Sequence, residues 1–383
     1  MLVQKLKKIF FTSTADWWAE FRQWEQLCCP KQTTMRLVFL FLFFLLLQFT
    51  VFFITLLYIP SHINTGSFFL NNGVPAILII GNTGSVMALT HMLSQRSRIG
   101  GIGTTLQQFD RTLQQLDFRL GCVEVVYWTT GWTLTVVITT ILFSIAIQLF
   151  GSLIFNNLNT TVLTVFMNVT NFPYIIFTVF FIICELCVTY RVKLLQSLLD
   201  GEMCSLATAR RMEKATRPSH VIAGLTDLHA QLSTVVGHMR AVFGLHVTVT
   251  MGAYVILFIF CIFSYYRAAV VLGEIETNFA LLTICWTLYN SCYLLPKILF
   301  GAWIRTETDK LTKLVHHYLR QTGEDIVQDQ QLEHVSLNIR TGLFTLNWPV
   351  YASVIGHIST YVIILIQFDS KAMDISKANS LQT

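Results

Sequence analysis

Long apolar stretches recur along the whole 383-residue chain, and they restrict the folds that it can adopt. A membrane-spanning helix needs about 20 consecutive, mostly apolar residues. Hydrophobic residues make up 54% of the sequence and charged residues only 12%, which is far from the balance of a soluble domain. The sequence therefore predicts an all-α membrane protein with seven transmembrane helices, at 36–59, 73–93, 126–150, 163–189, 241–265, 277–299 and 343–368.

Basic residues are distributed unequally between the two sides that seven spans define. Of the 26 Lys and Arg residues, all but Arg267, Lys371 and Lys377 lie in residues 1–36, 94–125, 190–240 or 297–342, which are the N-terminal segment and the connections after the second, fourth and sixth spans together with the adjoining span ends. Basic residues concentrate on the cytoplasmic side of membrane proteins. We therefore expect a cytoplasmic N-terminus and an extracellular C-terminus, which is the reverse of a G-protein-coupled receptor.

The loop between the third and fourth spans agrees with this orientation. The N-x-S/T sequons of the chain begin at Asn159 and Asn168, in or beside a loop expected outside the cell. Asn168 is close to the membrane, so Asn159 is the expected glycosylation site. None of the nine cysteines falls in an outer loop, which argues against an extracellular disulfide framework.

The cytoplasmic connections are long, and apolar residues recur in them every three or four positions. Such a period predicts amphipathic helices. Two interpretations remain open: caps that pack on their own chain, or helices around a symmetry axis that hold subunits together. The predicted organisation is a cytoplasmic N-terminal segment (1–35), spans 1–4 (36–189), an anchor region (190–240), spans 5 and 6 (241–299), a second anchor region (300–347), span 7 (348–368) and an extracellular tail (369–383).

The last apolar stretch, residues 360–368, consists of a Thr-Tyr pair, five aliphatic residues and a Gln-Phe pair. Lipid cannot satisfy the amide of Gln367, so this side chain should face protein or water. If several copies surround an axis, Ile364, Gln367 and Phe368 would form a constriction, and Asp369 would add a negative ring at its mouth. The alternative is that Gln367 and Asp369 only mark the point where the helix leaves the lipid.

A small-molecule site is expected among the outer halves of the spans, because helix bundles commonly bind ligands between their helices. These halves are rich in aromatic, amide and hydroxyl side chains and contain no carboxylate. Sugar sites often use acids to bind hydroxyl groups, so this composition favours a more apolar ligand. The candidate residues are Asn82, Gln148, Asn171, Tyr174, Phe177, Thr178, Tyr254, Phe258, Thr283, Trp286 and Asn290.

No enzymatic constellation emerges from the sequence, and no metal, cofactor or nucleic-acid partner is predicted. Gly100, Gly101 and Gly103 follow no strand and precede no phosphate-binding lysine, so a nucleotide loop is not expected. Glu185 is the one acid inside a span. Its default interpretation is a charge at a helix end, and the alternative is an ion-coupling site of a transporter.

The pattern of residues 360–368 resembles the Thr-Tyr, five-apolar, Gln-Phe signature of insect gustatory receptors. Seven spans, a cytoplasmic N-terminus, long inner connections and the length fit the same family. The resemblance implies a homo- or hetero-tetramer around a central pore, in the plasma membrane of sensory neurons. Its activity would be that of a ligand-gated, non-selective cation channel, with a small-molecule tastant, monovalent and divalent cations and the lipid bilayer as partners.

Carried onto this chain, the resemblance also implies roles for residues of the last span. Gln367 and Phe368 would form the gate, and the inner helical regions would form a shared anchor. The acid-free pocket favours a bitter compound or a contact pheromone over a sugar. A metabotropic seven-helix receptor and a membrane transporter remain the alternatives. The other implied residues are Ile363 and Ile364, which face or back the pore, and Thr360 and Tyr361, which brace the helix.

Overall fold

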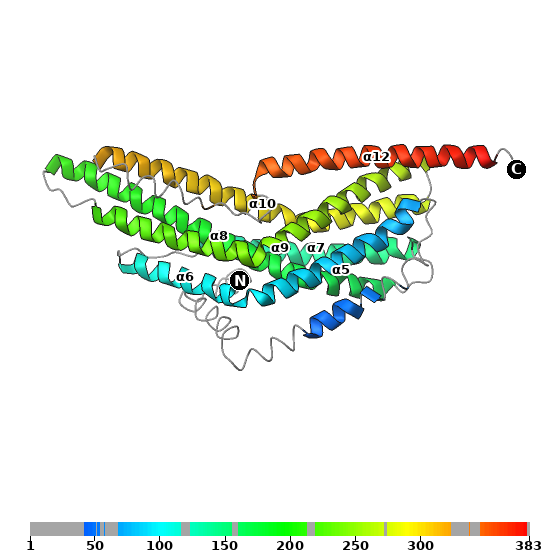
Figure 1. The fold of residues 1–383 in the computed structure, drawn as a ribbon, viewed down its shortest axis with the longest axis horizontal. Coiled ribbons are helices and arrows are strands. Elements are labelled where there is room, and N and C mark those ends of the chain that lie inside the picture. The colour runs from blue at the N-terminus through cyan, green and yellow to red at the C-terminus, as the bar shows by residue number, and fades with distance from the viewer. Residues whose placement is uncertain are drawn as a thin grey trace, which may run out of the picture.

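The computed structural model describes residues 42–50, 52–53, 57, 68–115, 123–154, 160–212, 219–271, 274–322, 337 and 345–380. These residues are almost entirely helical, which confirms the expected all-α fold (Figure 1). A helical stretch at 42–50 precedes the main elements. The main elements are α5 (Phe68–Ser94), α6 (Arg96–Gln115), α7 (Val123–Ile154), α8 (Thr160–Met212), α9 (Ser219–Val271), α10 (Glu274–Thr322) and α12 (Trp348–Ser380).

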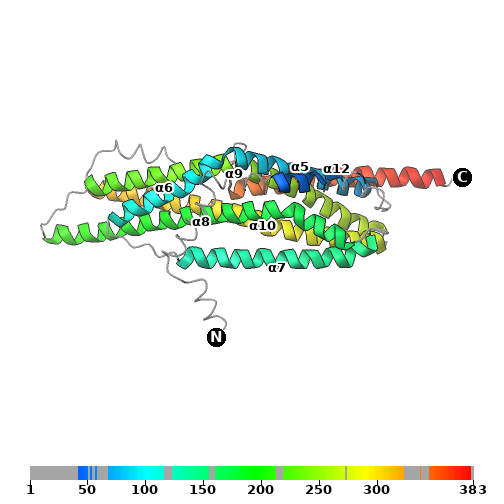
Figure 2. The same ribbon diagram turned by 90° about the horizontal axis from the view of Figure 1, so that it is seen from below.

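Three helices are much longer than a bilayer requires. α8, α9 and α10 contain 53, 53 and 49 residues, whereas about 20 residues are enough to span the hydrocarbon core. Each runs from one end of the elongated molecule to the other (Figures 1 and 2). At one end, here called the anchor end, they lie with α6, and at the other end they lie with α5, α7 and α12. The predicted inner helices are therefore continuations of spans in the described part of the chain.

The described helices include five segments that are long and apolar enough to cross a membrane, and α7 contributes a shorter apolar segment. The predicted first span, 36–59, lies mostly outside the described residues, as do the N-terminal segment 1–35 and Asn159. The five long segments are Pro75–Ser94, Ile175–Gly201, Gly224–Val270, Thr277–Tyr318 and Trp348–Lys371, and the shorter one is Leu134–Phe150.

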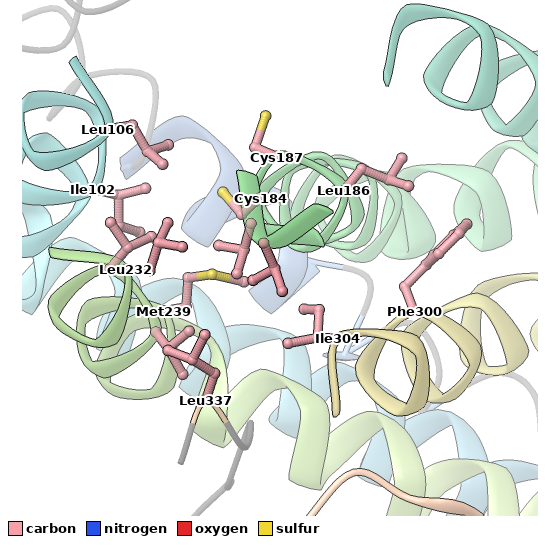
Figure 3. Close-up of a cluster of buried hydrophobic side chains, with 14 of the residues drawn as sticks. Ile102, Leu106, Cys184, Leu186, Cys187, Leu232, Met239, Phe300, Ile304 and Leu337 are labelled. Atoms are coloured by element: carbon pink, nitrogen blue, oxygen red, sulfur yellow. The ribbon is translucent and has the colours of Figure 1, made fainter. Parts of the chain in front are cut away.

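The larger hydrophobic core lies at the anchor end, between α6, α8, α9 and α10. Figure 3 shows part of it, with Ile102, Leu232, Met239 and Ile304 gathered around Cys184. Burying one such aliphatic side chain contributes about 1.5–3 kcal/mol. The apolar stripe that predicted a helix in the first anchor region is buried here within its own chain, which favours the interpretation of intrachain packing. Its buried members are Leu225, Leu228, Leu232, Val235, Val236 and Met239.

A buried ion pair attaches α6 to α8. Arg191 donates from Nη2 to Oδ2 of Asp110 at 2.7 Å and from Nε to Oδ1 at 3.0 Å. Its Nη1 donates to the carbonyl oxygen of Cys187 at 3.0 Å, and the guanidinium lies over the ring of Phe109. A two-bonded arginine–carboxylate pair is both strong and directional. It therefore sets the position of α6 more sharply than apolar packing alone can.

Candidate functional site

The helix α12 carries the residues predicted to form the pore, and it lies along one edge of the bundle (Figure 1). It begins at Trp348, where Oδ1 of Asn347 accepts a hydrogen bond of 3.1 Å from the backbone N–H of Val350. Pro349 occupies the first turn, where its missing N–H removes no helical hydrogen bond. The helix then runs without interruption to Ser380, packing chiefly along α9 and only slightly against α10.

Opposite faces of α12 differ sharply in exposure. Ile358 and Val362 are 1% and 6% exposed and pack on the chain, whereas Ile363 and Phe368 are 56% and 61% exposed. The exposed set is the one predicted to line or brace the pore. An apolar helix face of this kind is a feature of interaction surfaces. The other exposed members of the set are Thr360, Tyr361, Ile364 and Gln367.

Asp369 differs from the other residues expected at the pore mouth. Its Oδ2 accepts a hydrogen bond of 3.1 Å from Nη1 of Arg267 on α9, and the two side chains are 6% and 5% exposed. The carboxylate is thus paired within its own chain, because α12 continues past this point and keeps Asp369 on its buried face. Arg267 was not recognised as a partner in the sequence, although it is the one basic residue of the predicted outer loops between spans.

One predicted ligand residue of α10, Trp286, belongs to a cluster of aromatic rings between α7 and α10. The ring of Phe143 stacks on that of Tyr289, with 4.4 Å between centroids and an interplanar angle of 14°. The ring centroid of Trp286 lies 6.4 Å from that of Phe143, with an interplanar angle of 29°. The ring of Tyr293 lies edge-on to that of Tyr289, and its hydroxyl lies 3.2 Å from Oγ1 of Thr140. The two tyrosines were not among the predicted residues, although their spacing on α10 places them on one helix face with Trp286.

A cluster of ionisable side chains is buried where α8, α9 and α10 meet. Glu185 and Lys297 are 0% exposed and His246 is 1% exposed. Nζ of Lys297 lies 3.2 Å from Nε2 of His246, and Oγ1 of Thr178 lies 3.4 Å from the same nitrogen. Neither carboxyl oxygen of Glu185 has a hydrogen-bond partner among the described residues, and the described ion pairs do not include one between Glu185 and Lys297, although the ammonium of Lys297 is near enough to act on Glu185 electrostatically. The expectation of a helix-end charge at Glu185 is therefore wrong, because this group is enclosed by three helices.

The buried acid lies next to the start of α12. A Cβ atom at Gly301 would be 3.3 Å from Oε1 of Glu185 and 3.1 Å from Cβ of Leu346. Leu346 is buried just before α12 begins. The glycine on α10 thus permits a close approach that brings Glu185 and the residue just before α12 to the same point.

The remaining predicted ligand residues do not gather around one point. Tyr254 stacks on Phe258 with 5.8 Å between centroids, and its hydroxyl accepts a hydrogen bond from Ser291 at the edge of the anchor-end core. Asn82 on α5 is 1% exposed, and its Oδ1 has no hydrogen-bond partner among the described residues. The ring of Phe177 is edge-on to His246, the hydroxyl of Thr283 is hydrogen-bonded to that of Ser264, and Asn290 donates to the carbonyl of Trp286. Gln148 is half-buried, and the side chains of Asn171 and Tyr174 lie outside the described set.

The sequence and fold of this chain were compared with those of known proteins. The sequence model of the family described as 7tm Chemosensory receptor matches residues 21–372. The chain belongs to this chemosensory receptor family. The expected resemblance to insect chemoreceptors is thereby confirmed, and the family is one of membrane receptors rather than enzymes.

Solved structures show that the receptor shares its fold with an insect olfactory receptor. OR5 from Machilis hrabei has 11% sequence identity and a TM-score of 0.60, with 85% of this chain and 88% of that chain covered. OR5 in complex with eugenol has 12% identity and a TM-score of 0.59, with 91% and 99% covered. A search of curated proteins finds no match. At this identity the likeness establishes the fold of the receptor and leaves its ligand to be inferred.

Proposed function

We propose that this receptor is a ligand-gated, non-selective cation channel of the gustatory type, in which four copies place α12 around a central pore. The exposed face of α12 carries this proposal. Only 11% of the α12 span is buried, compared with 61% of the α8 span. Lipid alone would cover the isoleucines of this face, but it cannot satisfy the exposed amide of Gln367. A water-filled axis lined by neighbouring copies satisfies both kinds of side chain.

The same face supplies a gate. Phe368 and Ile364 present apolar surface next to the Gln367 amide. Rings of apolar side chains close pores by excluding water, and a neighbouring polar ring selects what passes. Ligand would bind better to a conformation in which the Phe368 ring has left the axis, and so would shift the closed–open equilibrium. The predominance of basic residues in the predicted inner segments supports a cytoplasmic anchor end.

Phe368→Ala is expected to give a ligand-independent cation current, because the largest apolar group of the proposed constriction is removed. The measurement is whole-cell current in cells expressing the chain, with G-protein signalling blocked and current normalised to surface receptor. Leu288→Ala is the control, since this leucine is 62% exposed, as Phe368 is 61% exposed, but belongs to α10 and not to α12. An unchanged gating curve in Phe368→Ala would remove this residue from the gate. A ligand response that disappears with the signalling block would favour a metabotropic receptor instead.

The aromatic stack between α7 and α10 is the proposed ligand site. Phe143, Trp286 and Tyr289 pack their rings together in the span half that the sequence predicts to be outer, and hydroxyl groups lie beside them. A ligand that inserts among these rings would meet flat apolar faces. The relative OR5 has been solved with eugenol, a small aromatic molecule. This composition favours a bitter compound or a contact pheromone over a sugar. The proposed location is the plasma membrane of sensory neurons.

Trp286→Ala is expected to raise the half-maximal concentration of an agonist by about tenfold, since an aromatic contact contributes about 0.5–1.5 kcal/mol beyond its buried area. The agonist would be found by testing panels of bitter compounds, sugars and cuticular lipids in the same current assay. Tyr265→Ala is the control, because this aromatic residue of α9 is 64% exposed. An unchanged concentration–response curve for Trp286→Ala would exclude the stack as the ligand site.

A further inference from the structure

The ion pair between Arg267 and Asp369, here called the clasp, joins the end of α9 to the pore helix. The bond of 3.1 Å is shielded from solvent by the bundle. Asp369 directly follows the two residues proposed as the gate, Gln367 and Phe368. The clasp therefore acts on α12 within one turn of the constriction.

The clasp lies at the centre of the buried face of α12. Successive residues of a helix are rotated by about 100°, so Ile358 and Val362 fall within about 20° of Asp369 on the helix circumference. By the same geometry Phe368 lies about 100° away and Gln367 about 160° away. The exposures agree, since Ile358, Val362 and Asp369 are buried and the gate residues are exposed. The rotation that pairs Asp369 with α9 is thus the rotation that turns Phe368 and Gln367 away from the chain.

Little else fixes this rotation. α12 touches α10 only slightly and packs chiefly along α9. Leu365 and Ile366 are half-buried against a second, smaller hydrophobic cluster that includes Phe143, Phe263 and Phe279. Apolar contacts of this kind are non-directional and tolerate small rotations of a helix. A charge-assisted hydrogen bond has a defined direction, and separating two charges inside a bundle is costly. A second polar contact between these helices, Tyr351 with Tyr254, lies in the first turn of α12, far from the proposed gate. Among the described residues, the clasp is therefore the directional contact that distinguishes one rotation of the gate end of α12 from another.

We propose that Arg267 is a positioning residue for the pore helix, and that its bond to Asp369 holds α12 in the rotation that presents Phe368 to the channel axis. This inference rests on the proposed function. A rotation that takes the Phe368 ring out of the axis also carries Asp369 away from Arg267, so the clasp stabilises the closed state. The charge of Asp369 is used to hold the helix and does not form a free negative ring at the mouth.

The test compares the neutral double variant Arg267→Gln/Asp369→Asn, each single variant, and the exchanged pair Arg267→Asp/Asp369→Arg. Ligand-free cation current per surface receptor and single-channel conductance are measured in each. We expect a severalfold higher ligand-free open probability in the neutral double variant, with unchanged single-channel conductance. The exchanged pair is expected to return the open probability toward that of the original chain. The neutral double variant leaves no unpaired buried charge, so folding does not depend on the clasp being intact.

Lys371→Met is the control, because it removes a charge on α12 two residues beyond Asp369 without touching the clasp; Lys371 is exposed. It shows whether the loss of a nearby charge by itself changes the open probability. An unchanged open probability in the neutral double variant would overturn the proposal. So would a reduced single-channel conductance in Asp369→Asn without a change in open probability, because that result is expected of a charged mouth.

A second measurement separates the clasp from the channel function. The thermal midpoints of the purified chain, its two single variants and the neutral double variant form a double-mutant cycle. Each single variant should be less stable than the double variant, because it leaves one charge buried alone. If the two single substitutions change the thermal midpoint additively, Arg267 and Asp369 are not energetically coupled, and the proposal is overturned even if the chain conducts ions. A different result would separate the two ideas: the midpoints are coupled, the chain reaches the cell surface, and neither the original chain nor the neutral double variant carries current. That result would overturn both the proposed pore and the gating role of Arg267. The ion pair would then be a structural contact.

Discussion

Replacing Lys297 with methionine is expected to destabilise the receptor by about 1–3 kcal/mol, because His246 loses a buried hydrogen-bond partner and Glu185 loses the opposite charge that acts on it. Glu185 and Lys297 are both fully buried, so water cannot take the place of the missing charge. The measurement is the thermal midpoint of the detergent-purified chain, followed by fluorescence-detected size exclusion. The double variant Glu185→Gln/Lys297→Met should recover much of the loss, since it removes both charges together.

The matched control for this prediction is Lys310→Met on the same helix. The Lys310 side chain is 58% exposed, although it also pairs with an acid, Glu307, at 3.0 Å. Exposed pairs contribute at most about 1 kcal/mol. Equal losses in the two lysine variants, or a double variant no better than Lys297→Met, would show that Glu185 and Lys297 are not energetically coupled.

Asp110→Asn is the second substitution with a large expected effect, about 3–5 kcal/mol, because it leaves a buried guanidinium without its carboxylate. Arg191 is 2% exposed and uses both oxygens of Asp110. The loss should appear locally as faster hydrogen exchange in α6, which this pair attaches to α8. Asp309→Asn, at an exposed position of α10, is the control. Asp110→Glu should retain part of the stability, and equal exchange rates in Asp110→Asn and the original chain would contradict the prediction.

The fold was largely predictable because its determinants are local. An apolar run long enough to cross a bilayer is visible in the sequence, and so is the helical period of residues such as Leu228, Leu232 and Val235. The continuity of the helices was less visible. Residues 190–240 were divided from the spans as a separate region, whereas α8 and α9 each extend from the membrane segment into it. Where the apolar run gives way to polar residues, the helix leaves the membrane for water, but it does not have to end there.

The polar contacts of the site could not be predicted, because they join residues far apart in the chain. Arg267 and Asp369 are 102 positions apart, and Arg191 and Asp110 are 81 positions apart. Lys297 follows an apolar run and was counted with the cytoplasmic connection, but α10 continues through it and turns it toward His246. Hydrophobic pattern indicates which face of a helix is buried and does not indicate which helix covers it. The residues of α12 that we propose to line the pore could be named from the sequence because they form a local signature.

The length of α9 has a mechanical consequence for the receptor. Its 53 residues contain no proline and correspond to a rod of about 80 Å, with Arg267 near one end and the core residue Leu232 near the other. A tilt of about 5° at the outer end would displace the opposite end by about 7 Å, if the rod stays straight. In the proposed channel, motion started by a ligand at the outer end of one copy would thus be amplified by leverage at its anchor end. The receptor would sense with one end of α9 and move most at the other.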